Sequence, residues 1–397
     1  MKKKVLFLAL GYPNVAKSTI LYTDLMQEFG EQGHEVLVVA PAYEKGNYGC
    51  RVEGKVNVLR VKTLPLFKVG AIKKGIANLL LPYQYKRAIK KNGDLDFDLV
   101  ILPTPPITLF SVASWLKSKT KAKTYLILRD IFPQNAVDLK MMKENSILHK
   151  YFRKQELKLY KLVDSIGCMS KANITYVKQH NPSLDHSKFH LLPNWEKIPS
   201  SISKEGIAAV SEKLDISDKF VAIFGGNLGK PQQLENIVSL AQSCKEIKDI
   251  FFLILGSGTE SERVKQLIAQ DNLTNIKLVG RVPKMEYVQI LAAADVGLIS
   301  LHKQFTIPNF PSKVLTYFGL KKPVLASLDL STDFGQMLDE TKSGLWSEAG
   351  NIDAFKKNLL WLYNNREESI QMGENGYNYM KLHLTPEIAY RTIMENI

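Results

Sequence analysis

The sequence predicts an α/β protein with two doubly wound, Rossmann-like domains. The chain has 397 residues, and at roughly 100 to 200 residues per domain this length favours two domains over one small module. Its hydrophobic content of 45% and charged content of 23% are those of ordinary globular proteins. Short apolar runs alternate with longer amphipathic segments in both halves, which is typical of the strands and helices of parallel sheets.

The expected strands are apolar runs that end in Gly, Pro, Asp or Ser and lead into an amphipathic segment. In the first half they are residues 5–10, 35–40, 98–102, 124–128 and 165–169. In the second half they are residues 220–224, 251–255, 276–279, 296–300 and 323–327. Two such sheets are expected to face each other across a central cleft, because open α/β sheets bind ligands at the carboxyl ends of their strands.

The domain boundary is expected at Trp195, where a short apolar piece stops at a proline and a serine-rich stretch, residues 199–203, follows. This places an N-terminal domain at 1–195 and a C-terminal domain at 196–375. The last segment, 376–397, is expected to be a C-terminal helix that packs back on the N-terminal domain.

Several classes are excluded by composition. The three cysteines form no Cys-x-x-Cys pair and are odd in number, so neither a disulfide framework nor a cysteine-rich metal site is expected, and a reducing cytoplasm fits best. The lysine-rich start and the short apolar run after it are interpreted as a first buried strand rather than a signal peptide. The sequence contains no run of 18 consecutive apolar residues, so no membrane-spanning helix is expected.

Net positive charge is confined to the first half of the chain. Residues 1–195 carry 31 Lys and Arg against 15 Asp and Glu, a net charge of +16, whereas 196–397 carry 22 against 24, a net charge of −2. Such asymmetry favours an anionic partner for the first domain.

The densest basic segment, residues 54–93, holds ten Lys and Arg and no acidic residue. Aliphatic and aromatic residues lie between the cations, a pattern that suits an anionic membrane surface at about 1 kcal/mol per cation. We therefore expect a peripheral membrane protein, with contacts through Lys73, Lys74, Arg87 and Lys90. The alternatives are a solvated face over a core stripe and nucleic-acid binding, although no nucleic-acid-binding motif accompanies the charge.

A partial phosphate-loop motif follows the first expected strand. Residues 11–18 match G-x-x-x-x-G-K-[ST] except at Ala16, where the second glycine is missing. Alanine serves poorly where a backbone must approach phosphate closely. A P-loop nucleoside triphosphatase therefore stays an alternative, and Gly11 and Ser18 are assigned to the acceptor or membrane side.

Glycine-rich turns end two strands of the second half. The first, residues 225–230, includes Gly226, Asn227 and Lys230, and the second includes Gly256 and Gly258. Backbone amides at such turns can meet a pyrophosphate, so the two turns together predict one nucleotide pocket, although glycine turns also occur for packing alone.

A third element of this pocket begins at residues 311–313. Ser312 is expected to be a helix N-cap, which places Lys313 in the first helical turn. A cation there is unfavourable for the helix dipole unless an anion is bound nearby. The alternative is an exposed lysine that the helix start tolerates.

Taken together, these motifs resemble the GT-B-fold family 4 retaining glycosyltransferases, and more closely the branch that builds bacterial capsule, O-antigen and colanic-acid-like polysaccharides. The matching landmarks follow the family's order over almost the whole chain. They are residues 33–36, 129–134, 192–195, 226–229, 256–258, 280–283, 294–298 and 311–313.

The resemblance implies a C-terminal domain that binds a nucleoside diphosphate sugar, with UDP-sugars favoured, and an N-terminal domain that binds an undecaprenyl-diphosphate-linked saccharide. It also implies a cytoplasmic hexosyltransferase on the inner face of the cell membrane. The implied donor-binding residues are Gly226, Asn227, Lys230, Gly256, Gly258, Arg281, Ser312, Lys313, Leu315 and Thr316.

The sequence departs from the family pattern at several of these places. The family's Glu-x7-Glu pair would fall at Pro308 and Thr316, so both carboxylates are absent. The Arg and Lys that usually neutralise the diphosphate would fall at Asn227 and Gln232, and Lys321 replaces a usual glycine.

Glycosyl transfer requires stabilisation of the leaving diphosphate, and backbone amides with Lys313, helped by Lys230 and Arg281, would supply it. No metal ion or other cofactor is then expected, and no D-x-D triplet or His/Asp cluster occurs. Asp130 is expected to bind the donor sugar or orient the acceptor hydroxyl, with Arg129 beside it. The alternative role for Asp130 is a helix N-cap.

Retention of anomeric configuration is implied by the resemblance alone. Two rival functions remain at this stage. A sugar-nucleotide 2-epimerase shares the architecture, and a catalytically silent donor-binding subunit would explain the missing glutamates.

Overall fold

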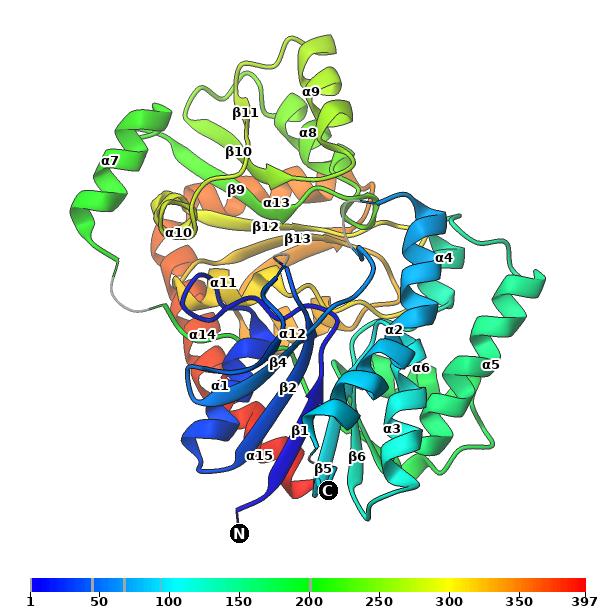
Figure 1. The fold of residues 1–397 in the computed structure, drawn as a ribbon. Helices are drawn as coiled ribbons and strands as arrows, with labels where there is room; N and C mark the ends of the chain where they lie inside the picture. Colours follow the sequence, from blue (N-terminus) through cyan, green and yellow to red (C-terminus); the bar gives the residue numbers. More distant parts are fainter. Residues whose placement is uncertain (1, 44–45, 67–68, 94, 200–201) are drawn as a thin grey trace. The chain divides into compact units, whose positions relative to one another are not determined.

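The computed structural model describes residues 2–43, 46–66, 69–93, 95–199 and 202–397, which form two compact units (Figure 1). Unit 1 comprises Met1–Trp195 and Pro386–Ile397, and unit 2 comprises Glu196–Thr385. Phe67 and Lys68 of the basic segment, and Ser200 and Ser201 of the serine-rich stretch, lie outside the described residues.

Unit 1 is built on an eight-stranded sheet in the order β3-β4-β2-β1-β5-β6-β7-β8. The strands are β1 (Lys4–Leu8), β2 (Glu35–Pro41), β3 (Gly49–Glu53), β4 (Val56–Val61), β5 (Leu99–Pro103), β6 (Lys123–Leu128), β7 (Ser165–Cys168) and β8 (Phe189–Leu191). Its helices are α1 (Leu21–Glu31), α2 (Ala71–Asn92), α3 (Phe110–Lys117), α4 (Gln134–Asp138), α5 (Ile147–Leu162), α6 (Lys171–His180) and α15 (Pro386–Glu395). Adjacent strands pair in parallel except the hairpin β3–β4.

The five strands expected in the first half are confirmed as β1, β2, β5, β6 and β7. Strands β3, β4 and β8 were not expected. The hairpin turns at Gly54, whose φ of +65° lies in the left-handed region that favours glycine. Only the turn and β4 of this hairpin lie inside the basic segment, whose second half forms α2.

Unit 2 is built on a six-stranded parallel sheet in the order β11-β10-β9-β12-β13-β14. The strands are β9 (Phe220–Asn227), β10 (Ile250–Ser257), β11 (Ile276–Val279), β12 (Val296–Ser300), β13 (Val324–Leu328) and β14 (Gly344–Glu348). Its helices are α7 (Lys204–Leu214), α8 (Glu235–Ser243), α9 (Ser261–Gln270), α10 (Lys284–Ala293), α11 (Lys313–Gly319), α12 (Phe334–Thr341), α13 (Ile352–Asn364) and α14 (Arg366–His383). The five expected strands are present, and β14 is an addition.

Both faces of the unit 2 sheet are covered, which explains why its strands are apolar without interruption. Along β9, Val221 and Ile223 belong to one buried cluster, whereas Ala222 and Phe224 belong to the cluster on the opposite face. Successive side chains of a strand point to opposite faces, so a strand buried on both sides must be apolar at every position. Each fully buried Val, Ile or Phe contributes about 1.5–3 kcal/mol of transfer free energy.

The expected division at residue 375 differs from the structure, because it falls inside α14. A Cβ atom at Gly376 would lie 2.4 Å from the Phe318 ring, and one at Gly373 would lie 2.0 Å from the carbonyl oxygen of Lys321. This close packing keeps α14 in unit 2. After unit 2, the chain returns to unit 1 at Pro386. Helix α15 then packs on α1 through residues that include Tyr390 and Ile393 (Figure 1).

Among the described helices, none combines the length and the apolar character needed to cross a bilayer.

Candidate active site

The glycine turns of unit 2 meet at the carboxyl ends of two paired strands. Gly226 on β9 pairs with Gly256 on β10, with φ values of +123° and +143°. A Cβ atom at Gly256 would lie 1.9 Å from the carbonyl oxygen of Gly226, and one at Gly258 would lie 2.1 Å from that of Leu228. Only glycine fits these positions, and the structure thus brings together the two turns that the sequence assigned to one pocket.

Lys313 reaches the same place from α11. A Cβ atom at Gly226 would lie 3.1 Å from Cε and 3.7 Å from Nζ of Lys313. The ammonium lies over the Phe224 ring, 4.7 Å from its centroid, as a cation–π contact. Burial of the ammonium lowers the pKa of Lys313 to about 8, and the side chain as a whole is half-buried. A partly desolvated cation therefore lies directly against a glycine strand end.

Tyr317 fixes α11 against the sheet and so positions Lys313. Its hydroxyl accepts a hydrogen bond of 3.1 Å from the amide of Gly225 and lies 3.2 Å from the carbonyl oxygens of Ile223 and Leu298. The side chain is buried, and burial raises its pKa well above the usual range. Neither Tyr317 nor Phe224 was among the expected site residues, although Tyr317 follows Thr316 and Phe224 is two positions before Gly226.

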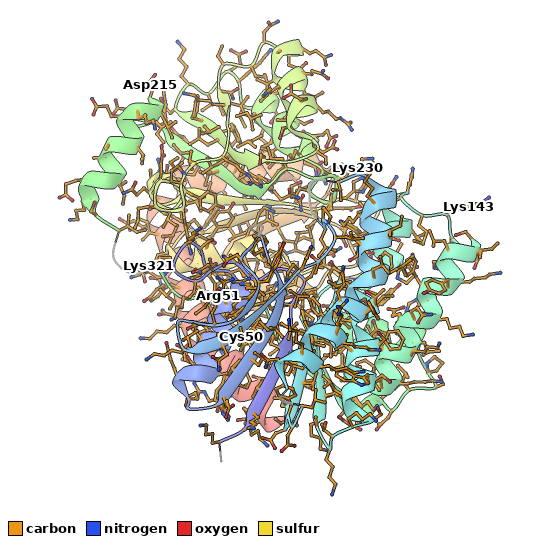
Figure 2. The ribbon with its side chains drawn as sticks, in the orientation of Figure 1. Cys50, Arg51, Lys143, Asp215, Lys230 and Lys321 are labelled. Atoms are coloured by element: carbon orange, nitrogen blue, oxygen red, sulfur yellow. The ribbon has the colours of Figure 1, made fainter. Side chains whose placement is uncertain are left out.

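Arg281 lies at the second glycine turn. Its Nε donates a hydrogen bond of 2.7 Å to the hydroxyl of Ser257, between Gly256 and Gly258. Lys230 is exposed on the short turn that follows β9 (Figure 2). Gln232, at a position where the family has a cation, accepts a hydrogen bond of 3.1 Å from the Gly229 amide and so shapes this turn.

Asn227 is the exposed last residue of β9, and its side-chain nitrogen would lie 2.9 Å from a Cβ atom at Gly229. The side-chain amide of Asn227 therefore lies close to the glycine turn, at the rim of the expected pocket.

Two expected contacts on α11 need correction. Leu315 is 2% exposed and belongs to the apolar core, so its side chain cannot contact a ligand. Ser312 occupies the N-cap position as expected, but its side chain makes no capping hydrogen bond. Its backbone is already helical, with φ −62° and ψ −19°, which differs from the extended geometry typical of a capping serine.

Thr316 is paired with a carboxylate that the sequence motifs did not indicate. Its hydroxyl donates a hydrogen bond of 2.9 Å to Oε2 of Glu196, the first residue of unit 2. Burial, with the charge of Glu196 adding to it, raises the pKa of Tyr287 to about 12. A carboxylate is therefore present beside α11, although the residue at position 316 is not acidic.

In unit 1, Arg129 and Asp130 directly follow β6, at the carboxyl end of the sheet. The guanidinium of Arg129 lies 4.5 Å from the centroid of the Trp195 ring. Its three nitrogens are buried and make no well-formed hydrogen bond. Burial lowers the pKa of Arg129, and the nearby Tyr22 hydroxyl opposes that lowering. Burial raises the pKa of the Asp130 carboxyl, and Arg129 opposes that rise.

The N-cap role for Asp130 is excluded, because α4 begins at Gln134 and its N-cap is Pro133. Asp130 instead lies in the short connection between β6 and α4. A carboxyl with a shifted pKa next to a guanidinium with buried nitrogens, at a strand end, is a candidate for a functional site.

The phosphate-loop alternative is also contradicted. The amide of Ala16 donates to Oδ1 of Asn14 at 2.9 Å, and the amides of Lys17 and Ser18 donate to the Asn14 carbonyl oxygen. The amides that would cradle a phosphate are therefore occupied within the loop. Helix α1 begins only at Leu21, after this turn.

The membrane-side cations lie on α2, and all four are exposed. Lys73, Lys74, Arg87 and Lys90 are accompanied by exposed apolar side chains. These are Ile76 (49% exposed), Leu79 (56%), Leu80 (44%) and Tyr83 (66%). The opposite face of α2 is buried through residues that include Leu81, Tyr85 and Ile89.

In the described part of the chain, no three His, Cys, Asp or Glu side chains gather as ligands for a metal ion.

Two family models match successive parts of the chain. The model described as Glycosyltransferase Family 4 matches residues 20–195. The model described as Glycosyl transferases group 1 matches residues 207–379. The two matches fall in unit 1 and unit 2, respectively.

Curated relatives carry related names. The chain is 28% identical over 249 residues to the probable glycosyltransferase WbjE of Pseudomonas aeruginosa, a match that covers 62% of the chain and 61% of the relative. It is 22% identical over 180 residues to the putative colanic acid biosynthesis glycosyl transferase WcaI of Escherichia coli (strain K12), which covers 45% and 44%. The chain thus spans less than two thirds of the length of either relative.

Solved structures show the same fold at low identity. Sucrose-phosphate synthase from Thermosynechococcus elongatus has a TM-score of 0.76 at 14% identity, with 99% of this chain and 98% of that chain covered. Anabaena HepE, solved in complex with UDP and glucose, has a TM-score of 0.73 at 15% identity and the same coverage. WaaG, a glycosyltransferase involved in lipopolysaccharide biosynthesis, has a TM-score of 0.71 at 11% identity, with 98% of both chains covered.

Proposed function

Because the chain belongs to the GT-B-fold glycosyltransferases that join a family 4 domain to a group 1 domain, we propose that it moves a hexosyl group from a nucleoside diphosphate sugar to a lipid-linked saccharide in bacterial surface polysaccharide synthesis. The observation that carries this proposal is the position of Lys313, a half-buried cation against the glycine end of β9. A diphosphate bound at Gly226 would receive backbone amides and this ammonium together.

The donor is a nucleoside diphosphate sugar, with UDP-sugars as the favoured class. Lys313 has lost much of its hydration, and an anion beside it would restore that lost stabilisation. Arg281 adds a second cation at the paired glycine turn. The complex of HepE with UDP and glucose supports a uridine nucleotide for a protein of this fold.

Stabilisation of the leaving diphosphate falls to Lys313, with Arg281 and Lys230 as further cations, and the reaction needs no metal ion. Charge that develops on the leaving group is stabilised best by groups already in place, since they need no reorganisation during the reaction. Transfer proceeds with retention of configuration.

In unit 1, Asp130 orients the acceptor hydroxyl and Arg129 binds an acceptor phosphate or holds Asp130. The guanidinium of Arg129 has hydrogen-bonding capacity to spare, because none of its buried nitrogens makes a well-formed hydrogen bond. An acceptor phosphate would use that capacity.

The lipid part of the acceptor lies along α2. A groove of about 880 Å³ is lined by the apolar Leu64, Leu80 and Tyr83 and by the cations Arg87 and Lys91. No acidic residue is among the residues that line it. An apolar surface whose charged lining residues are all cations suits an anionic lipid, and the protein accordingly acts at the inner face of the cell membrane.

The product belongs to a capsule, an O-antigen or a similar surface polysaccharide. The name of WcaI assigns that relative to colanic acid biosynthesis, and WaaG is described as acting in lipopolysaccharide biosynthesis. Both descriptions support a surface polysaccharide as the product class.

The test is a transfer assay with a panel of UDP- and GDP-sugars and an undecaprenyl-diphosphate-linked saccharide. The wild type should transfer sugar from at least one donor, and nuclear magnetic resonance of the product should show the anomeric configuration of the donor. Lys313→Ala and Asp130→Asn should lose most of this activity, whereas the control Lys277→Ala, at an exposed lysine on edge strand β11, should retain it. Full activity in both site variants would show that the site is assigned wrongly.

The same assay separates the rival functions. A sugar-nucleotide 2-epimerase would change the free UDP-sugar without any acceptor. A silent donor-binding subunit would bind UDP and never transfer sugar to the lipid acceptor.

A further inference from the structure

A second polar cavity lies in unit 1, at the loops that follow β1 and β2. Its volume is about 260 Å³, just below the range of about 300–1,000 Å³ typical of pockets for drug-sized ligands. It can therefore hold one sugar-sized group. Its lining residues are Pro13, Asn14, Lys17, Ala42, Tyr43, Asn47, Arg51, Glu53 and Arg60.

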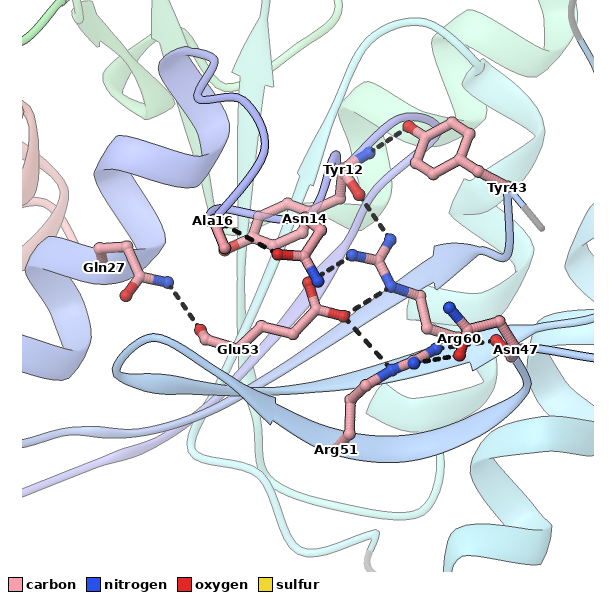
Figure 3. A network of polar contacts seen from close by, with 9 residues as sticks. All are labelled: Tyr12, Asn14, Ala16, Gln27, Tyr43, Asn47, Arg51, Glu53 and Arg60. Atoms are coloured by element: carbon pink, nitrogen blue, oxygen red, sulfur yellow. Dashed lines mark hydrogen bonds and ion pairs between the residues drawn. The ribbon is translucent and has the colours of Figure 1, made fainter.

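The floor of this cavity is a buried ion pair between Arg60 on β4 and Glu53 on β3 (Figure 3). The side chains are 4% and 2% exposed, and Nε of Arg60 donates to Oε1 of Glu53 at 2.9 Å. Arg60 also donates to the carbonyl oxygen of Tyr12 and lies 5.9 Å from the ring centroids of both Tyr12 and Tyr43. The charges of this pair cancel, and its contacts fix the floor rigidly.

Positive charge in the cavity therefore comes from Arg51 and Lys17. Arg51 is 32% exposed, and its two terminal nitrogens donate to the side chain and the carbonyl oxygen of Asn47. Its Nε lies 3.4 Å from Oε1 of Glu53. These contacts use three of the five N–H groups of a guanidinium, so the group is held in one orientation and two N–H groups remain for a ligand.

Tyr43 adds a neutral donor. Its hydroxyl oxygen accepts a hydrogen bond of 2.8 Å from the Tyr12 amide, which leaves its own proton to donate. The cavity thus presents an oriented guanidinium and a hydroxyl, with the charge of Lys17 nearby, and the one carboxylate among its described lining residues is already paired. Donors in excess of acceptors match the oxygen atoms of an anion.

We infer that this cavity binds an anionic oxygen group, a carboxylate or a phosphate, carried by a sugar of the acceptor. The inference rests on the proposed function, because it assumes that unit 1 binds the acceptor. The enzyme would then select acceptors by charge at Arg51, apart from the donor site in unit 2. Two sources share this chemistry, an acidic sugar of the saccharide and a phosphate group of its lipid carrier.

The test measures the binding of small probes by nuclear magnetic resonance at a fixed ionic strength of about 0.15 M, where the Debye length is about 8 Å. The probes are glucuronate, glucose 1-phosphate, inorganic phosphate and neutral glucose. We expect at least one anionic probe to bind the wild type at least tenfold more tightly than glucose. Arg51→Gln should remove that difference, and Lys158→Gln, at an exposed lysine on α5, should leave it unchanged.

The probe that binds identifies the source. Preference for glucuronate indicates an acidic sugar, and preference for glucose 1-phosphate and phosphate indicates the carrier. Equal binding of all probes, or equal losses in Arg51→Gln and Lys158→Gln, would overturn the inference. Arg51 is partly exposed, so its variant should fold, and circular dichroism checks this.

Binding of UDP, measured on the same samples, separates this inference from the proposed function. If UDP binds and no anionic probe does, only the acceptor inference fails. If an anionic probe binds and UDP does not, the donor assignment fails and the cavity stands.

Discussion

The ammonium of Lys313 lies 4.7 Å from the centroid of the Phe224 ring, so the start of α11 and the end of β9 meet at one point. Gly226 is at the same point, because a side chain there would contact Lys313. A cation thus lies against an aromatic ring, next to a backbone conformation that favours glycine. Partial burial of this charge costs stability in the free protein, and a bound anion would reduce that cost.

Binding of UDP should take up protons above pH 8. The pKa of Lys313 is lowered from 10.5 to about 8 by burial, and a bound diphosphate would raise it again. Calorimetry at pH 8.5 in two buffers of different ionisation enthalpy should therefore detect proton uptake in the wild type and none in Lys313→Met. Equal proton uptake in both proteins would assign the effect to another group.

The same pKa shift predicts how stability depends on pH. The folded pKa lies below the unfolded one, so between about pH 8 and 10.5 the unfolded chain binds more protons and the Lys313 contribution to stability rises with pH. Below pH 8 both states carry the proton, and the full cost of burying the charge remains. Lys313→Met should therefore reduce this rise in urea unfolding experiments, and an unchanged pH dependence would contradict the assignment.

Gly256→Ala should destabilise unit 2 more than Gly226→Ala. A Cβ at Gly256 would collide with backbone at 1.9 Å, and the positive φ adds strain, so we expect a loss of roughly 3 kcal/mol. At Gly226 the neighbour is the flexible end of Lys313, so the stability loss should be about 1 kcal/mol while UDP affinity falls. Gly280→Ala is the control, since no atom lies within 4 Å of a Cβ there. Thermal unfolding of the three variants gives the order.

Thr316→Val should weaken the attachment of Glu196 to α11. The substitution removes a hydroxyl that donates to a carboxylate, an interaction worth about 1.5–3 kcal/mol when the acceptor is charged. A double-mutant cycle with Glu196→Gln measures the coupling directly. A coupling energy near zero would show that the hydrogen bond does not contribute to stability.

Attachment to anionic vesicles should depend on α2. Replacing Lys73, Lys74, Arg87 and Lys90 by Gln removes four exposed charges at about 1 kcal/mol each, so partitioning should fall by up to about a thousandfold. The matched control replaces Lys143, Lys150, Lys154 and Lys158, which are also exposed in unit 1. Flotation should weaken with salt. Salt-insensitive flotation, or equal losses in both quadruple variants, would argue against α2 as the membrane contact.

Much of the fold was predictable because parallel strands buried on both faces are continuous apolar runs, as along β9 and β10. Strand β4 was missed because it lies inside the basic segment, whose charge suggested a single amphipathic stretch, and its hairpin partner β3 directly precedes that segment. The boundary at residue 375 was wrong because no local pattern marks the close packing of Gly373 and Gly376 on α11 and the loop after it.

The glycine turns and Lys313 were predictable, because their residue types are needed wherever backbone and a cation approach phosphate. The partner of Thr316 was not, since Glu196 is 120 positions away in the sequence and no spacing rule connects them. The same holds for the stacking of Arg129 on Trp195 and for the Arg60–Glu53 floor, which arise only when distant segments fold together.

The most direct test of the donor site is calorimetric titration of UDP into the wild type, Lys313→Gln and Lys277→Gln at pH 7. A charge-assisted contact is worth about 1.5–3 kcal/mol, so the dissociation constant should rise roughly 10- to 150-fold in Lys313→Gln and stay unchanged in Lys277→Gln. Equal affinity in all three proteins would contradict a diphosphate site at Gly226 and Lys313.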